Sequence, residues 1–324
     1  MSYGLPYQGS KNRIARRLVD ALPAAPVLYD VFCGGCAVTH AAMLSGKYQR
    51  FVINDRRGWL PDAFRKAIHG GYAHEDRWIS REDFERLKST DAYAAMCFSF
   101  GNGTRTYMYA RPLERYKRAL HYAIFWRDFA PWEELCPETA DALASGLAPI
   151  EDRKQRRIQA GHFIVESLKA QLAAGTLTPD ILQNPIYRQI RRSKGAMTTV
   201  ETLQSQTLQS LGSLERLERL ERLPDTLTAH SGDYRGLCFD EPGIIYCDPP
   251  YKDTTGYGED CAEPFCHDEF YSWCEAQKLP VYISEYQMPE ERFACIAEWD
   301  KVTTMAAKTT SHATERLWRP RVQL

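Results

Sequence analysis

Between positions 27 and 35 the chain runs Val27-Leu28-Tyr29-Asp30-Val31-Phe32-Cys33-Gly34-Gly35. This mainly apolar run, followed by two glycines, predicts a short buried strand from 27 to 32 that enters a tight turn. A helix is predicted next, over 37–44, and a second short strand over 51–53, which ends at Asn54-Asp55. The order strand, helix, strand predicts that the two strands lie parallel in one sheet.

The far end of the chain repeats this pattern. Strands are predicted over Gly243–Cys247 and Pro280–Ser284, with a helix over His267–Lys278 between them, and a helix over Arg13–Leu22 precedes the first strand. The two ends therefore look like halves of one sheet. The fold class predicted is α/β, a Rossmann-like sheet whose core comprises residues 1–75 and 228–324, with a mainly helical insertion over 76–227.

The composition is that of an ordinary globular protein. The chain has 324 residues, of which 44% are hydrophobic and 26% charged, and it contains neither a run of 18 apolar residues nor a targeting pattern at its start. Its ten cysteines are scattered rather than spaced as a disulfide framework. We therefore expect a cytoplasmic protein with reduced thiols and no membrane partner.

The formal net charge of −1 does not by itself indicate a nucleic-acid partner. Cations are nevertheless concentrated locally: five lie between Arg105 and Arg118 against one acid, and a second cluster has no acid in it. Each run could be a solvated helix face or a phosphate-binding surface. The candidate phosphate contacts are Arg105, Arg111, Arg188, Arg191, Arg192 and Lys194.

Leucine recurs at every third position from 208 to 223. On an α-helix this spacing drifts by about 60° per step, so the leucines circle the helix instead of forming one seam. A helix buried on several sides, a self-associating helix and an extended segment all fit the pattern. We assign it no chemistry.

The chemistry is concentrated in Asp248-Pro249-Pro250-Tyr251, which follows a predicted strand and so should lie at the ligand-binding edge of the sheet. The lone pair of an aromatic amino group is delocalised into its ring. The Asp248 carboxylate and the Pro249 carbonyl could accept the two amino hydrogens and free that lone pair to attack a sulfonium methyl group, while the two prolines stiffen the carbonyl. Tyr251 offers a flat face for a base turned out of a duplex. The alternative is a simple Asp-Pro turn.

Two further elements support a nucleotide-like ligand. The glycines Gly34 and Gly35 let the backbone approach a ligand closely, and Asp55, about twenty residues on, could bond ribose hydroxyls. The complete G-x-G-x-x-G pattern of nicotinamide-binding proteins is absent. Lys11 lies outside any G-x-x-x-x-G-K-[ST] phosphate loop, which argues against a nucleoside triphosphate site.

Taken in order, these elements resemble the Dam-type, D12 class adenine-specific DNA methyltransferases, over roughly residues 5–70 and 230–290. The resemblance implies S-adenosylmethionine as cofactor, no metal, and double-stranded DNA as partner. It implies catalytic roles for Asp248, Pro249, Pro250 and Tyr251, and cofactor contacts from Tyr7, Lys11, Asp30, Phe32, Gly34, Gly35, Asp55, Asp233, Tyr234 and Asp248. The segments 98–107 and 283–286 resemble a phage or prophage branch of the class.

The sequence also departs from the family pattern. Gly9-Ser10-Lys11 stands where the family often has Gly-Gly-Lys, and the insertion matches the better-known members poorly, so no target sequence can be transferred. By the resemblance, we expect a monomer or a weak homo-oligomer. A cognate restriction enzyme is a candidate partner.

Four other functions compete with this prediction. A methyltransferase of the same kind could act on cytosine N4, on adenine in RNA or on a glutamine side chain, or the chain could be a catalytically silent DNA-binding protein. Cys33-Gly34-Gly35-Cys36 also spells the C-x-x-C of thiol oxidoreductases or half of a zinc site. Zinc ligation by Cys261, Cys266, His267 and Cys274 fits no finger spacing, so packing is the favoured role of these residues.

Overall fold

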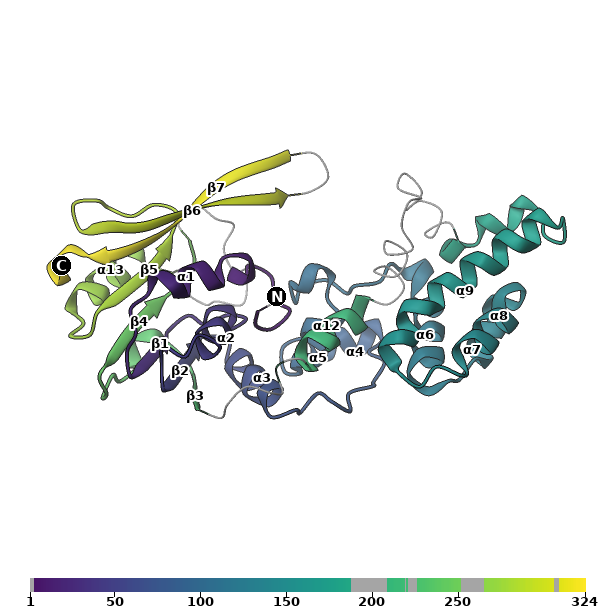
Figure 1. The fold of residues 1–324 in the computed structure, drawn as a ribbon, viewed down its shortest axis with the longest axis horizontal. Helices are drawn as coiled ribbons and strands as arrows, with labels where there is room; N and C mark the ends of the chain where they lie inside the picture. The colour runs from purple at the N-terminus through teal and green to yellow at the C-terminus, as the bar shows by residue number, and fades with distance from the viewer. Residues whose placement is uncertain (1–2, 188–208, 219, 221–225, 252–264, 306–308) are drawn as a thin grey trace. The chain divides into compact units, whose positions relative to one another are not determined.

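The computed structural model describes residues 3–324 except 188–208, 219, 221–225, 252–264 and 306–308 (Figure 1). The chain divides into two compact units. The first comprises Met1–Ala73 and Arg216–Leu324, and the second His74–Glu215.

The first unit is built on a mixed sheet whose seven described strands have the order β3-β2-β1-β4-β5-β7-β6. The strands are β1 (Val27–Asp30), β2 (Arg50–Asp55), β3 (Leu227–Ser231), β4 (Gly243–Cys247), β5 (Val281–Glu285), β6 (Phe293–Met305) and β7 (Thr309–Pro320). The first five strands pair in parallel, and β7 pairs antiparallel with both β5 and β6. The predicted α/β class is confirmed, and β1 beside β4 joins the two ends of the chain in one sheet, as predicted.

Helices of the first unit accompany the strands. They are η1 (Lys11–Arg13), α1 (Ala15–Ala21), α2 (Ala37–Met43), α3 (Trp59–Ile68), η5 (Tyr234–Gly236), α13 (His267–Ala276) and η7 (Arg321–Gln323). The predicted first helix is shorter than expected, because a 3-10 turn with Lys11 in it precedes α1. The predicted first strand also ends two residues early, at Asp30.

The central strands are buried on both faces, as is typical of parallel strands. Every residue of β1 is buried. One face of β1, β4 and β5 packs with Phe270 and Cys274 of α13 through Val27, Ile245 and Ile283. Burying such side chains contributes about 1.5–3 kcal/mol each. A well-packed centre therefore holds the strand ends, and the residues that follow them, in fixed positions.

The second unit is helical. Its helices are α4 (Arg81–Leu87), α5 (Ala92–Cys97), η2 (Phe100–Asn102), α6 (Arg111–Trp126), α7 (Ala130–Leu135), α8 (Pro137–Leu147), α9 (Arg153–Ala173), η3 (Pro179–Gln183), and most of α12 (Gln209–Glu218). Within α12 and the residues after it, Leu214, Leu217 and Leu220 of the leucine repeat are buried, which fits a helix covered on more than one side. The side chains of the other leucines of the repeat lie outside the described residues.

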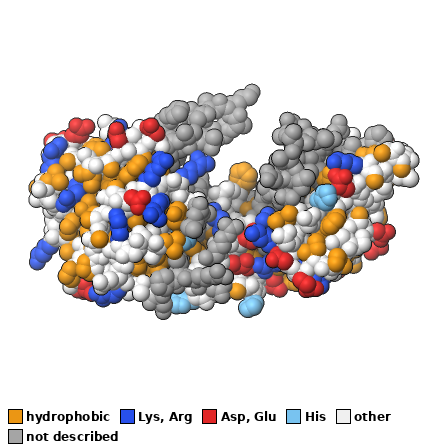
Figure 2. Space-filling model, in the orientation of Figure 1, with side chains coloured by type: hydrophobic (Ala, Val, Ile, Leu, Met, Phe, Trp, Pro, Cys, Tyr) orange, Lys and Arg blue, Asp and Glu red, His pale blue; other side chains and the backbone are white. Residues whose placement is uncertain are grey.

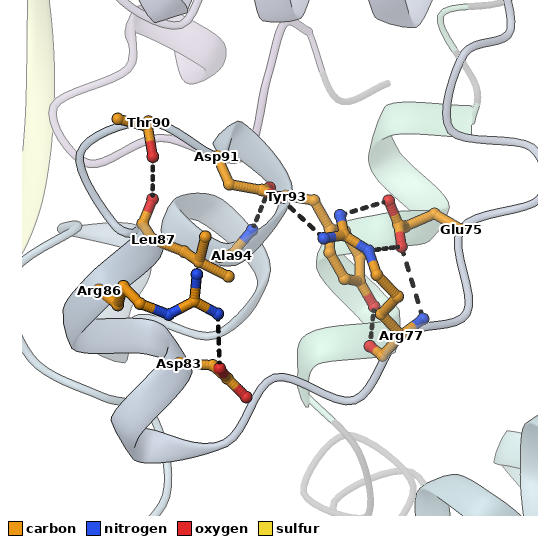
Figure 3. A network of polar contacts seen from close by, with 9 residues as sticks. All are labelled: Glu75, Arg77, Asp83, Arg86, Leu87, Thr90, Asp91, Tyr93 and Ala94. Atoms are coloured by element: carbon orange, nitrogen blue, oxygen red, sulfur yellow. Dashed lines mark hydrogen bonds and ion pairs between the residues drawn. The ribbon is translucent and has the colours of Figure 1, made fainter.

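Polar side chains fix the start of this unit. Asp91 accepts the Ala94 N–H at the beginning of α5 and also pairs with Arg77 at 2.9 Å (Figure 3). Arg77 pairs with Glu75 at 2.7 Å, and its carbonyl accepts the Tyr93 hydroxyl. Because one carboxylate both caps a helix and holds the preceding segment, the chain enters α4 and α5 along a defined path. No helix among the described residues is long and apolar enough to cross a membrane.

Candidate active site

Three acids stand where neighbouring parallel strands end. Asp30 ends β1, Asp55 ends β2, and Asp248 directly follows β4. Because β2, β1 and β4 are adjacent in the sheet, their carboxyl ends meet at one edge, which is where open α/β sheets bind ligands.

Lys11 joins this edge from the N-terminal segment. Its side chain is buried, and its Nζ lies 2.7 Å from Asp248 Oδ1 and 3.7 Å from Glu315 Oε1. Burial lowers the pKa of Lys11, but the two carboxylates outweigh it, so the pKa is raised above its ordinary value. Lys11 is therefore a permanent cation in the site.

Tyr251 lies between Lys11 and the antiparallel strand β7. The Lys11 Nζ lies 4.4 Å from the centre of its ring, and its hydroxyl donates to Glu315. Tyr286, directly after β5, packs edge-to-face with the ring at 4.6 Å and 85°. Burial, with the nearby carboxylates of Asp248 and Glu315, raises the pKa of Tyr251, so its hydroxyl keeps its proton and stays a donor.

The glycine loop after β1 packs closely against the N-terminal segment. Gly34 has φ +46°, a left-handed conformation that favours glycine, and a Cβ on Gly35 would lie 2.9 Å from the Cβ of Tyr7. The Gly35 carbonyl accepts the Leu5 N–H at 2.7 Å. Gly4 has φ +67°, and a Cβ there would lie 2.2 Å from the same carbonyl. The N-terminal segment thus covers the loop directly.

Asp55 ties this loop to β2. Its carboxylate accepts the N–H groups of Gly34 and Arg57, each at 2.9 Å, and the Arg57 side chain donates to the Tyr7 hydroxyl at 2.8 Å. Burial raises the pKa of Asp55 against the effect of these hydrogen bonds. The observed contacts give Asp55 a structural task, and its bonding of a ribose stays a prediction.

Asp30 is the most constrained of the acids. One oxygen accepts the Thr39 hydroxyl at 2.6 Å, while Oδ1 is buried with no hydrogen-bond partner among the described residues. Burial raises the pKa of Asp30 to about 7; the Thr39 bond opposes the rise, and the carboxylates of Asp248 and Asp55 add to it. A buried acceptor without a donor has a specific requirement that a ligand could meet.

Phe32, Asp233 and Tyr234 are the other predicted cofactor contacts. The rings of Phe32 and Tyr234 are 5.2 Å apart, and Tyr234 is buried. Asp233 caps η5 and forms an exposed ion pair with Arg235 at 2.9 Å. The structure thus brings Tyr234 to Phe32, whereas Asp233 is engaged by its own neighbour.

The cysteine alternatives gain no support from the described residues. Cys33 and Cys36 are buried, and burial raises the pKa of both thiols, the opposite of the low pKa of a reactive thiol. Cys274 packs in the hydrophobic core, Cys266 is exposed, and Cys261 lies outside the described residues. No three His, Cys, Asp or Glu side chains in the described part of the chain gather as metal ligands.

The basic run has one buried member. Arg105, Arg111, Arg115 and Arg118 are exposed, and the last three fall on one face of α6. Glu114, the single acid of the run, pairs with Arg81 at 3.2 Å. Lys117, the fifth cation of the run, instead lies in the core of the second unit, where burial lowers its pKa to about 7.

One face of the molecule carries charges of both signs. In Figure 2, cationic, anionic and apolar side chains are interspersed over the face drawn. The second predicted cluster, Arg188, Arg191, Arg192 and Lys194, lies outside the described residues.

Two site residues were missed from the sequence. Glu315 lies on β7, and Tyr286 directly follows β5. Because β5 and β7 pair antiparallel, both residues lie beside Tyr251. Nothing in the local sequence distinguishes Glu315 from a surface acid. The only available signal was an acid beside the apolar pair Leu317-Trp318 in a strand-like run.

Comparison with known proteins agrees with the sequence motifs. A search of curated proteins finds no match to the chain. Residues 7–121 match the family model for D12 class N6 adenine-specific DNA methyltransferase, a segment that holds Lys11, the glycine loop and Asp55. The resemblance seen in the sequence is therefore confirmed: residues 7–121 are similar to the D12 class N6 adenine-specific DNA methyltransferases.

Proposed function

We propose that the chain transfers a methyl group from S-adenosylmethionine to the N6 amino group of adenine in double-stranded DNA. The observation that carries the proposal is the meeting of Asp248-Pro249-Pro250-Tyr251 with Lys11, Asp30 and the glycine loop at one edge of the sheet. The family match supports the same activity.

The residues beside the glycine loop fit the proposed cofactor. S-adenosylmethionine, when bound, supplies an electrophilic methyl group on a sulfonium centre. The unpartnered Asp30 Oδ1 is a suitable acceptor for a cationic amino group. The loop glycines allow close approach of a ligand, and the rings of Phe32 and Tyr234 offer an apolar surface for a nucleoside.

Asp248 and Pro249 would handle the amino group of adenine. The Asp248 carboxylate would accept a hydrogen bond from one N6 hydrogen, and the Pro249 carbonyl would accept one from the other. These two hydrogen bonds would direct the nitrogen lone pair toward the methyl group. Lys11 contacts Asp248 at 2.7 Å and so holds the carboxylate in place. This arrangement favours direct transfer without a covalent enzyme intermediate.

Tyr251 would hold the base. Lys11 lies over one face of its ring, so an adenine turned out of the duplex would stack on the other face. Stacking of this kind contributes about 1–3 kcal/mol and offsets part of the cost of unstacking the base.

The exposed cations of the second unit would contact phosphates. Arg105 and the α6 residues Arg111, Arg115 and Arg118 form this proposed surface. Since Glu114 is engaged by Arg81, the charge of the α6 face is not neutralised by the one acid of its run. The residues Arg188 to Lys194 are proposed as further contacts from their charge alone.

Long-read sequencing of DNA from cells that express the protein tests the proposal, because it reports the modified base and its sequence context together. We expect N6-methyladenine in a defined context with the natural chain and none with Asp248→Ala. The Asp248→Ala protein should keep most of its DNA affinity. Methylation of cytosine, of RNA alone, or of nothing would contradict the proposed reaction.

A further inference from the structure

Glu315 is a fully buried acid that arrives at the site from the far end of the chain. It lies on β7, and the next residue, Arg316, pairs in register with Glu285 of β5. Its carboxylate accepts the Tyr251 hydroxyl and lies 3.7 Å from Lys11 Nζ. An ionised carboxylate is costly to bury unless it is paired and hydrogen-bonded, and these two contacts meet that requirement.

Four side chains thus form a connected group, which we call the Lys11 cluster: Lys11, Asp248, Tyr251 and Glu315. Lys11 contacts both carboxylates and the Tyr251 ring, and Glu315 contacts both Lys11 and the Tyr251 hydroxyl. Two of the four, Asp248 and Tyr251, are proposed to touch the adenine. Glu315 reaches Tyr251 directly, through the hydroxyl, and reaches Asp248 through the ammonium group of Lys11, which contacts both carboxylates.

We propose that Glu315 is a positioning residue for methyl transfer, acting through Tyr251 and Lys11. By accepting the Tyr251 hydroxyl it fixes the direction of the ring on which the base stacks. By sharing the Lys11 ammonium group it keeps that cation from being committed to Asp248 alone, so Asp248 retains lone-pair capacity for the N6 hydrogen. The proposal rests on the proposed function of the site.

If Glu315 had a role in packing alone, its substitution would have a different effect from the one that a positioning role predicts. Gln has nearly the shape of Glu and can still accept a hydrogen bond from Tyr251, but it carries no charge. If Glu315 only fills space, Glu315→Gln should behave as the natural protein. If it positions the reacting groups, the same variant should fold and bind DNA while transferring the methyl group slowly, because misplacement by about 1 Å can cost about a hundredfold in rate.

The experiment compares Glu315→Gln, Tyr251→Phe and the double variant in single-turnover methylation of an adenine-containing duplex, with DNA and cofactor affinities measured separately. Glu298→Gln is the control, since Glu298 is an exposed acid on the partner strand β6 that pairs with Arg316. We expect Glu315→Gln and Tyr251→Phe each to slow transfer about tenfold to a hundredfold, with DNA affinity changed less than about threefold. The double variant should be no more than about threefold slower than the slower single variant, because Tyr251→Phe removes, and Glu315→Gln weakens by loss of charge, the same hydrogen bond. The control should methylate normally.

Three results would overturn the inference: natural single-turnover rates in Glu315→Gln, fully additive effects of the two changes, or a loss of DNA affinity that matches the loss of rate. If Glu315→Gln does not fold, Tyr251→Phe decides alone, since it removes only the hydroxyl that Glu315 accepts, and a natural rate there would equally refute the idea. Absence of adenine methylation by the natural protein would instead refute the proposed function, so the two failures can be told apart.

Discussion

The stability of Asp30→Asn, measured relative to the natural protein, should be greater above pH 7 than at lower pH. The same variant should bind S-adenosylmethionine more weakly. The pKa of Asp30 rises from 3.8 to about 7 in the folded chain, where the carboxyl group is 2% exposed. Each pKa unit corresponds to about 1.4 kcal/mol. Holding the ionised form in the fold therefore costs about 4 kcal/mol, an upper value for a group that can relax.

The sign of the pH dependence follows from proton binding. Between pH 3.8 and about 7 the folded chain keeps the Asp30 proton that the unfolded chain has lost. The contribution of Asp30 to the free energy of unfolding thus falls as pH rises through this window and is constant above it. Asn does not titrate, so the stability of Asp30→Asn relative to the natural protein should grow by about 3 kcal/mol between pH 5 and pH 8. Any fixed cost of the amide cancels in this comparison.

Urea unfolding at a series of pH values measures the effect, and titration calorimetry measures cofactor affinity. Asp20→Asn is the control, because Asp20 is exposed and pairs with Arg16 on the surface of α1. In the natural protein the cofactor should bind about tenfold more weakly for each pH unit below 7, since protons compete for the Asp30 carboxylate. Asp30→Asn should bind weakly with no such dependence. A stability difference that does not change between pH 5 and pH 8 would refute the burial argument, and natural affinity in Asp30→Asn at pH 8 would refute the assignment of the amino group.

Four further outcomes are expected. Gly4→Ala should destabilise the fold by about 3 kcal/mol or more, because the new Cβ would meet the Gly35 carbonyl. The control Gly46→Ala, at φ +71° with no described atom within 4 Å of the new Cβ, should cost only about 1–2 kcal/mol. Equal melting temperatures of the two variants would contradict this. Replacing Arg111 and Arg118 with Gln should lower the salt slope of DNA binding by about 0.9 for each phosphate that is no longer neutralised, and Arg16→Gln should not change it; an unchanged slope in the α6 variant would rule out that surface. In a Cys261→Ser background, Cys238, Cys266 and Cys295 should react quickly with a thiol reagent while the buried thiols do not, and rapid labelling of Cys33 would reopen the C-x-x-C alternative. Methylation should persist in EDTA, and its complete loss would point to a metal.

The parts of the fold predicted from the sequence are those with strong local patterns. The strands at β1, β4 and β5 are apolar runs ended by glycine, proline or acid residues, and these signals do not depend on distant parts of the chain. Their parallel order also follows from the intervening helices. Because acids at the ends of such strands must share one edge, the meeting of Asp30, Asp55 and Asp248 could be anticipated.

The antiparallel side of the sheet could not be predicted in the same way. The strands β6 and β7 carry many polar residues, and β3 is half-exposed, so their apolar alternation is weak. A hairpin also depends on pairing between its two strands more than on either strand alone. Since β7 was not predicted, Glu315 had no expected place in the fold, although it lies as deep in the site as Lys11.

The charge balance of the site links these residues to the cofactor. The carboxyl groups of Asp30, Asp55, Asp248 and Glu315 lie at one edge of the sheet. Within the described residues, Lys11 pairs with Asp248 and Glu315, and Arg57 opposes the rise in the pKa of Asp55. Excess buried negative charge lowers stability, and the fold holds it in place through the packed sheet around it. A ligand with a cationic amino group and a sulfonium centre would relieve that excess, whereas an anionic nucleotide would increase it. The burial and neighbouring carboxylates that raise the pKa of Asp30 would therefore favour the proposed S-adenosylmethionine over nucleoside phosphates. Stabilisation of the fold by this cofactor should be greater in the natural protein than in Asp30→Asn.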